Sequence, residues 1–268
     1  MLTPPSDATP VPASRGDGGV QSVERAFTVL SLLADHGGQL SLSEVADLSG
    51  LPLPTAHRLL KTMASSGHVS RLPDRRYGLG PRLIGLGQKA TSLLHLWALP
   101  HLTRLVDVVG ETANLAVLDG SHVVYVAQVP SRHNMRMFTE VGRRVSPHCT
   151  GVGKAMLAAL DPEQADRVIN SLDFTAQTPH TIVTPDALRS ALDGVRQQGY
   201  AIDDGEQEIG VRCLAVAFQV GPSIAACSVS GPAARLTDET VRAAAPAVAE
   251  CAQAVAAAME KNRADQQG

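Results

Sequence analysis

The stretch LSLSEVADLSGLPLPTAHRLLKTM, residues 40–63, constrains the fold more than any other because it marks the ends of two short helices. Ser41 and Glu44 have the spacing of a capping box, and Gly50 stands where a glycine commonly ends a helix. Pro54 suits the first turn of the helix that follows. The stretch therefore predicts two helices joined by a tight turn. We expect the buried stripe of the second helix to be Ala56, Leu59, Leu60 and Met63.

The segments on either side extend this pattern. Upstream, SVERAFTVLSLLAD has helical spacing of its apolar residues, with Ser22 as candidate N-cap and an end near Gly37. Downstream of Gly67, HVSRLPDRRYGLG has two short strand-like arms, 68–72 and 76–79, around a turn. Three helices followed by a basic hairpin form the order of a winged helix-turn-helix, whose third helix enters the DNA major groove.

The third helix has a polar face that this assignment explains. Residues in its N-terminal half are placed to reach base edges, residues one turn later lie nearer phosphates, and arginines add positive charge to the wing. An ordinary solvated helix face is the alternative, but the capping box, the basic wing and the order of elements together favour DNA binding. The predicted DNA contacts are Thr55, His57, Arg58, Lys61, Thr62, Arg71, Arg75 and Arg76.

Composition limits the other classes of protein. The formal net charge is −3, so any binding to a polyanion has to be local. The 4 cysteines show no CxxC spacing and no paired histidine motif, so we expect no zinc site, no disulfide framework and no cofactor, and a cytoplasmic protein. Residues 1–20 are rich in Pro, Ser, Gly and Asp and are expected to be a disordered tail rather than a signal peptide, and no stretch predicts a membrane span.

A second domain is expected at 99–262, with a short tail at 263–268. A helical pattern from Pro81 to Pro100 predicts a linker and dimerisation helix, assigned to 81–98, with the apolar residues Leu83, Leu86, Ala90, Leu93, Leu94 and Trp97. TANLAVLDGSHVVYVAQV then predicts a hairpin turning at Asp119-Gly120. Further strands are expected at 135–141, 213–220 and 224–230, and helices at 151–160, after a Thr184 cap, and at 237–261. No parallel βαβ series is visible, which favours an α+β fold with a mixed or antiparallel sheet.

CTGVGKA in this second domain is not a nucleotide-binding loop. The leading glycine of that motif would fall at His148, and Ala155 replaces its metal-binding hydroxyl. What remains is a helix N-terminus whose amides at Gly151 and Val152 favour an anion or a carbonyl oxygen, or form an ordinary helix cap. An enzyme with Cys149 or Cys213 as nucleophile, activated by a histidine such as His148, is the alternative class. Catalysis is disfavoured because His148 and Cys149 are adjacent and would face opposite ways on a strand. The apolar run VRCLAVAF around Cys213 also suits a small buried thiol.

The chain resembles the IclR-type bacterial transcriptional regulators. The resemblance rests on seven blocks in the family's order: GVQSVERAFTVLSLLAD, LSLSEVADLSGLPLPTAHRLLKTM, RRYGLGPRLIGLG, GETANLAVLDG, HCTGVGKAMLAAL, GYAIDDGEQEIGVRCLA and CSVSGPAARLT. It implies a winged helix-turn-helix, a linker helix and an effector-binding domain with a curved antiparallel sheet, assembled as homodimers that often pair into tetramers. It also implies a small-molecule pocket lined by Gly151, Val152, Asp203, Cys213, Ser228 and Ser230, with Met137 in its apolar wall.

The expected function is therefore a repressor of a catabolic operon that reads a palindromic operator and responds to a small metabolite. The alternative is a cysteine-dependent hydrolase fused to a DNA-binding domain. SRHNMRMFTEVGRRVSPHCTGVGKA is most similar to the branch that controls allantoin and glyoxylate metabolism. Amides and hydroxyls would donate to the acceptor end of the ligand, and Asp203 would accept from its donor end. Allantoin and hydrated glyoxylate meet this description better than pyruvate or an aromatic acid does.

Overall fold

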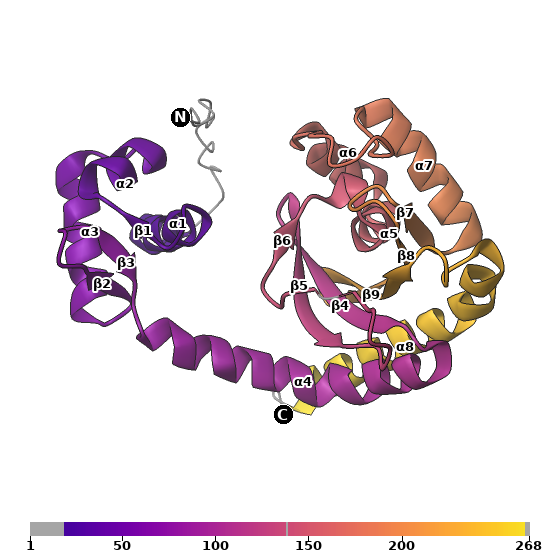
Figure 1. Ribbon diagram of the computed structural model, residues 1–268. Helices are drawn as coiled ribbons and strands as arrows, with labels where there is room; N and C mark the ends of the chain where they lie inside the picture. Colours follow the sequence, from indigo (N-terminus) through magenta and orange to yellow (C-terminus); the bar gives the residue numbers. More distant parts are fainter. Residues whose placement is uncertain (1–18, 138, 266–268) are drawn as a thin grey trace. The chain divides into compact units, whose positions relative to one another are not determined.

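The computed structural model describes residues 19–137 and 139–265, which form two compact units divided between Ala90 and Thr91 (Figure 1). The predicted tail at 1–20 lies almost wholly outside the described residues. Within the described part of the chain, no helix combines the length and the apolar character needed to cross a bilayer.

The first unit is built from three helices and a small antiparallel sheet. Its elements are α1 (Gln21–Asp35), β1 (Gln39–Leu40), α2 (Leu42–Ser49), α3 (Leu53–Ser65), β2 (Val69–Arg71) and β3 (Tyr77–Leu79), with the strand order β1-β3-β2. Its core is formed by Val29, Leu33, Leu40, Val45, Ala46, Ala56, Leu60, Met63, Val69 and Tyr77. The predicted winged helix-turn-helix is confirmed, and of the expected stripe on α3 only Leu59 is half-buried rather than buried.

Local signals account for the ends of these helices. The Ser41 hydroxyl accepts from the Glu44 amide at 3.2 Å, while a Glu44 carboxylate oxygen accepts from the Ser41 amide at 2.7 Å, so the capping box forms as predicted. Gly50 ends α2 at a φ of 64°, a conformation that glycine adopts without steric cost. The prediction for Ser22 is wrong: α1 begins at Gln21, and the carbonyl of Val20 accepts the amides of the first turn.

Helix α4 (Arg82–Val109) is longer than predicted. The sequence pattern places its end at Pro100, but the helix continues through this proline for nine more residues. A proline inside a helix costs about 3 kcal/mol. Ala98, Leu102, Leu105 and Val106 are buried along the same segment, and burying each of the larger side chains contributes roughly 1.5–3 kcal/mol, so tertiary packing outweighs the proline.

The second unit has a six-stranded sheet with every neighbouring pair antiparallel, in the order β6-β5-β4-β9-β8-β7. Its strands are β4 (Thr112–Asp119), β5 (His122–Val129), β6 (Arg144–Val145), β7 (Ala201–Asp204), β8 (Val211–Val220) and β9 (Ser223–Pro232). Its further helices are η1 (Pro147–Cys149), α5 (Gly151–Ala159), α6 (Pro162–Asn170), α7 (Pro185–Gln198) and α8 (Asp238–Asp265). The curved antiparallel sheet expected for this domain is confirmed, and a bulge between Leu115 and Ala116 adds to its bending.

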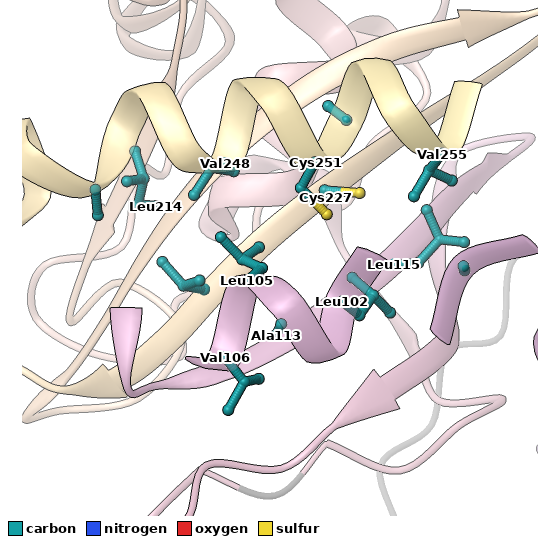
Figure 2. Packing of buried hydrophobic residues seen from close by; sticks show 14 of the residues in the cluster. Leu102, Leu105, Val106, Ala113, Leu115, Leu214, Cys227, Val248, Cys251 and Val255 are labelled. Atoms are coloured by element: carbon teal, nitrogen blue, oxygen red, sulfur yellow. The ribbon is translucent and has the colours of Figure 1, made fainter. Parts of the chain in front are cut away.

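The two faces of this sheet have different partners. One face packs on α8 and the C-terminal half of α4 through a core that includes Leu102, Leu105, Leu115, Leu214, Val248 and Val255 (Figure 2). The other face packs on α5 through a smaller cluster that includes Val152, Met156, Ala215 and Ala226. Polar residues take over this second face toward one end, where it holds the candidate site.

Four details of the second unit differ from the sequence predictions. The hairpin turns at Gly120 and Ser121, one residue later than expected, since Asp119 pairs with His122. The described residues of 135–141 contain no strand. Helix α6 was not predicted, although Asp161 caps it by accepting from the Gln164 amide at 2.9 Å. Helix α8 continues to Asp265, beyond the predicted end of the domain at 262.

Candidate functional site

The polar face of α3 is free in the first unit. His57, Arg58 and Lys61 are exposed, and Thr55 at the start of the helix is half-buried. Thr62 is exposed too, but its hydroxyl donates to the Arg58 carbonyl at 2.9 Å, which turns it toward its own helix. The face therefore offers cationic and imidazole groups in its first two turns, where a reading helix contacts bases.

The three wing arginines are not equivalent. Arg71 and Arg75 are exposed, and Arg75 sits at the turn with a φ of 69°. Arg76 is half-buried: its Nη2 donates to the Gln39 carbonyl at 3.1 Å and lies 3.6 Å from a Glu44 carboxylate oxygen. Arg76 therefore ties the wing to β1 and α2, which leaves Arg71 and Arg75 as the wing's available cations.

A cavity opens in the second unit beside the polar end of the sheet. The space between its walls is about 480 Å³, a figure that includes the part open to solvent. Its lining comes from β5, the segment before β6, the start of α5, and the β7–β8 region. The lining residues are Tyr125, Met137, Thr139, Arg143, Val145, Thr150, Asp203, Gln207, Glu208, Val211, Cys213 and Ser230.

The structure brings four of the seven predicted ligand residues to this lining, namely Met137, Asp203, Cys213 and Ser230. Gly151, Val152 and Ser228 lie next to lining residues without lining the cavity themselves. The Val152 side chain belongs to the apolar cluster under α5, and Ser228 is completely buried.

Close packing explains the glycines of CTGVGKA. A Cβ on Gly151 would lie 3.1 Å from the Cys213 sulfur, and one on Gly153 would lie 2.3 Å from the Pro147 Cα. The second distance is sterically impossible for a side chain. Thr150 caps α5 by accepting from the Gly153 amide at 3.2 Å. The motif is therefore built to seat α5 against β8 and η1.

Asp203 is the most strongly perturbed acid of the cavity. Its side chain is almost fully buried, and one oxygen accepts from the amides of Glu206 (2.8 Å) and Gln207 (3.4 Å). Burial raises the pKa of Asp203 to about 6, and the neighbouring Glu206 carboxylate adds to the shift. Asp203 is therefore mostly ionised at neutral pH and can accept hydrogen bonds from a ligand.

A polar ladder crosses three strands next to Asp203. The Gln128 amide donates to the Asn114 side-chain carbonyl at 3.1 Å. The Asn114 amide in turn donates to the hydroxyls of Ser228 (3.4 Å) and Ser230 (3.3 Å). Because each serine oxygen accepts a hydrogen bond from Asn114, the hydroxyl proton of each serine remains available to donate a hydrogen bond to another group. Asn114 thus fixes the donor character of Ser230 at the cavity wall.

The thiols do not have the geometry of a nucleophile with its base. Burial raises the pKa of Cys149 to about 12 and that of Cys213 to about 11, so both are protonated at neutral pH. His148 and Cys149 lie on η1 rather than on a strand. The His148 Nε2 lies 3.2 Å from the Thr175 carbonyl, which can only accept, so its Nδ1 accepts from the Ser146 hydroxyl at 2.6 Å. The Cys149 thiol donates to Gln207 Oε1 at 3.0 Å instead.

Sequence reasoning missed two donors of the cavity, Tyr125 and Arg143. Tyr125 and Arg143 are brought together by backbone pairing, since the Tyr125 amide donates to the Arg143 carbonyl at 3.2 Å. Burial raises the pKa of Tyr125, which keeps its hydroxyl a donor at physiological pH. The one signal in the sequence that pointed to Arg143 was the alternation of side chains along a strand. Arg143 and Val145 are two residues apart and therefore share a strand face.

A winged helix-turn-helix followed by a domain with a cavity lined by polar and charged side chains defines a ligand-sensing transcriptional regulator as the class of protein. Two family models agree: residues 22–73 match the IclR helix-turn-helix domain, and residues 89–257 match the bacterial transcriptional regulator IclR C-terminal domain. The chain belongs to the IclR family of transcriptional regulators.

Individual relatives are similar over most of their length. The transcriptional repressor IclR of Escherichia coli K12 is 36% identical over 249 residues, covering 87% of this chain and 91% of the relative. The HTH-type transcriptional repressor AllR of Salmonella typhimurium is 34% identical over 226 residues, covering 82% and 83%. The crystal structure of an IclR homolog from Microbacterium hydrocarbonoxydans, complexed with 4-hydroxybenzoate, superposes with a TM-score of 0.68 at 26% identity, covering 90% and 99%.

Proposed function

We propose that this DNA-binding regulator is a repressor of a catabolic operon, released from its operator by a small polar metabolite bound in the cavity of the second unit. The single observation that carries the proposal is the buried Asp203 carboxylate at the wall of that cavity, where Cys213 separates it from Ser230. Burying an acid without a full set of partners is costly, so such an arrangement is typical of a binding site. Two of the relatives described above are repressors, which supports repression as the sign of the regulation.

The operator is proposed to be palindromic and read by a homodimer or a dimer of dimers. In each copy α3 contributes Thr55, His57 and Arg58 to base edges and Lys61 to phosphates, while Arg71 and Arg75 of the wing contact the backbone. A two-fold pair of such units reads two half-sites. The exposed apolar residues of α4 in the first unit, Ile84 and Leu86, are proposed to lie in the dimer contact.

The effector is proposed to be small and to carry N–H or O–H donors. Asp203 has one oxygen occupied by backbone amides, and its other oxygen has no partner among the described residues. Allantoin and hydrated glyoxylate supply such donors, whereas pyruvate supplies none. The apolar groups of the lining are Met137, Val145, Val211, the Cys213 thiol and the ring of Tyr125, which suit a compact polar molecule better than an aromatic acid.

Calorimetry against allantoin, glyoxylate, pyruvate and 4-hydroxybenzoate tests the proposal, together with binding of the full chain to DNA from upstream of its own and neighbouring genes. We expect allantoin or glyoxylate to bind and to weaken DNA binding, and Asp203→Ala to abolish both effects while still binding DNA. Preference for 4-hydroxybenzoate, or a DNA affinity that no effector changes, contradicts the proposal.

A further inference from the structure

Arg143 is a charged residue in the lining of the cavity. Its side chain is exposed and lines the cavity beside Tyr125, and within the described residues its guanidinium makes no hydrogen bond or ion pair. The other charged groups of the lining are the carboxylates of Asp203 and Glu208. Arg143 is therefore the only positive charge among the lining residues that the structure describes.

Strand pairing fixes the direction of Arg143 and separates it from its neighbour Arg144. Val145 pairs with Val123 and Arg144 with Val124 on β5, so Arg143 and Val145 point to one side of the strand and Arg144 to the other. Arg144 accordingly forms an ion pair with Asp119 at 2.6 Å and does not line the cavity. Two adjacent arginines thus have the same chemistry but different surroundings.

The cavity consequently combines two opposite kinds of hydrogen-bonding group in one lining. Asp203 accepts hydrogen bonds, whereas Arg143 and Tyr125 donate them. The amides of Gly151 and Val152, which were expected to donate to the acceptor end of a ligand, do not line the cavity, whereas Ser230 does. Arg143 is the donor with a positive charge among the described lining residues. A planar guanidinium donates two parallel hydrogen bonds to a carboxylate, which is the geometry it binds most strongly.

We propose that Arg143 binds a carboxylate of the effector, so that the ligand class is a small carboxylic acid with N–H or O–H donors at its far end. This inference rests on the proposed function, since it concerns the same cavity. It narrows the candidates: neutral allantoin satisfies Asp203 alone, whereas a ureido or hydroxy acid satisfies Asp203 and Arg143 together.

Allantoin and its ring-opened acid, allantoate, form a matched pair of ligands because both carry ureido donors and only the second carries a carboxylate. Calorimetry of the full chain with each, at low and high KCl, gives the preference for the carboxylate. We expect wild type to bind allantoate at least about tenfold more tightly, as a charge-assisted pair allows, and to lose part of this preference in salt. Arg143→Met should abolish the preference, and Arg143→Lys should retain part of it.

Arg144→Met is the control, because it removes the same charge from the next residue and should keep the preference. Equal binding of both ligands by wild type, binding of no carboxylate, or an unchanged preference in Arg143→Met overturns the assignment of Arg143. The proposed function fails separately: it is lost if Asp203→Ala leaves the binding of every ligand unchanged or if no ligand alters DNA affinity. Thermal melting confirms that each variant is folded.

Discussion

Lys154 of α5 and Glu206 of the β7–β8 loop form an ion pair inside the second unit, with only 5% and 11% of their side chains exposed. The second Glu206 oxygen is buried and has no hydrogen-bond partner among the residues that the structure describes. The loop carrying Glu206 is also held by hydroxyls, since Thr178 donates to the Gly205 carbonyl at 2.6 Å and Thr181 to the Glu206 carbonyl at 2.7 Å. The pair therefore links the helix behind the cavity to the loop that supplies Gln207 and Glu208 to its lining.

Replacing Lys154 by methionine should lower the free energy of unfolding of this unit by about 3–5 kcal/mol, because it leaves the Glu206 carboxylate buried and unpaired. The double variant Lys154→Met/Glu206→Leu should recover most of the loss. Urea unfolding followed by circular dichroism measures both. The exposed pair Glu163–Arg167, 4.0 Å apart, is the control, and breaking it should change stability by less than about 1 kcal/mol. A single variant as stable as wild type contradicts the prediction.

Asp203 should make stability depend on pH in a known direction. Its folded pKa of about 6 lies above the ordinary value of 3.8, so the unfolded chain loses this proton first as pH rises. The stability gained from the protonated acid is complete below pH 3.8 and is lost as pH rises through 6. Asp203→Asn should therefore be more stable than wild type at pH 7, by up to about 3 kcal/mol, and this advantage should vanish near pH 4.

The measurement is the difference in unfolding free energy between wild type and Asp203→Asn at several pH values, which cancels the titration of all other groups. Asparagine keeps a carbonyl oxygen for the amides of Glu206 and Gln207. Asp203→Asn should also bind the effector more weakly. Asp203 would then lower the stability of the folded protein while contributing to ligand binding. A difference that stays constant from pH 4 to 7 would show that the acid does not titrate in this window.

On DNA, Arg58 and Arg75 should behave differently. Arg58→Ala should weaken binding to the operator by about 1–3 kcal/mol and relax sequence preference, because α3 reads base edges. Arg75→Ala should weaken binding to all sequences similarly and lower the salt dependence. Alanine and arginine are both disfavoured at the φ of 69° found at residue 75, so this substitution should not change the conformation of the wing. Anisotropy titrations at several KCl concentrations distinguish the two outcomes, and unchanged operator binding by a Thr55/Arg58 double alanine variant would refute the assignment.

The exposed apolar residues of α4 should control assembly. Ile84 is 64% exposed and Leu86 53% exposed in the single chain. Lysine at both positions should weaken the dimer, because it places charges in an apolar contact. Light scattering at micromolar concentration gives the oligomeric state. Val108, also on α4 and 65% exposed, lies outside the predicted 81–98 linker, so Val108→Lys should leave the dimer intact. A monomeric wild-type chain would refute the dimer itself. Two other apolar residues of the predicted dimerisation helix, Leu93 and Leu94, have side chains that lie outside the described part of the structure.

The elements with local end signals could be predicted from sequence alone. Ser41 with Glu44, Gly50, and Thr184 with Pro185 each satisfy or replace the backbone groups of a helix end within a few residues, so their effect does not depend on the rest of the fold. Asp161 gives the same kind of signal before Pro162, and α6 could have been found by the same reasoning.

Features decided by distant contacts could not be predicted. The segment near Met135 to Val141 alternates like a strand, but side chains take its carbonyls: Thr112 donates to the Met137 carbonyl and Arg235 to that of Met135, each at 3.0 Å. Arg235 is itself held by Glu111, 124 residues away in sequence. The same limitation applies to the cavity, because Tyr125, Arg143 and Gln207 come together only through the pairing of β5 and the folding of the β7–β8 loop.

Strand β9 shows how the sensor could change its ligand without changing its architecture. Ala225, Cys227 and Val229 face the core shared with α4 and α8, while Ile224, Ala226, Ser228 and Ser230 face α5 and the cavity side. Alternate positions of a single strand are therefore under two independent selections. Substitution at Ser230, which lines the cavity, can change recognition while the odd-numbered positions preserve the scaffold. An insertion of one residue would exchange the two sets of side chains and disrupt both the core and the cavity. Strand β9 should therefore tolerate insertions and deletions far less than substitutions.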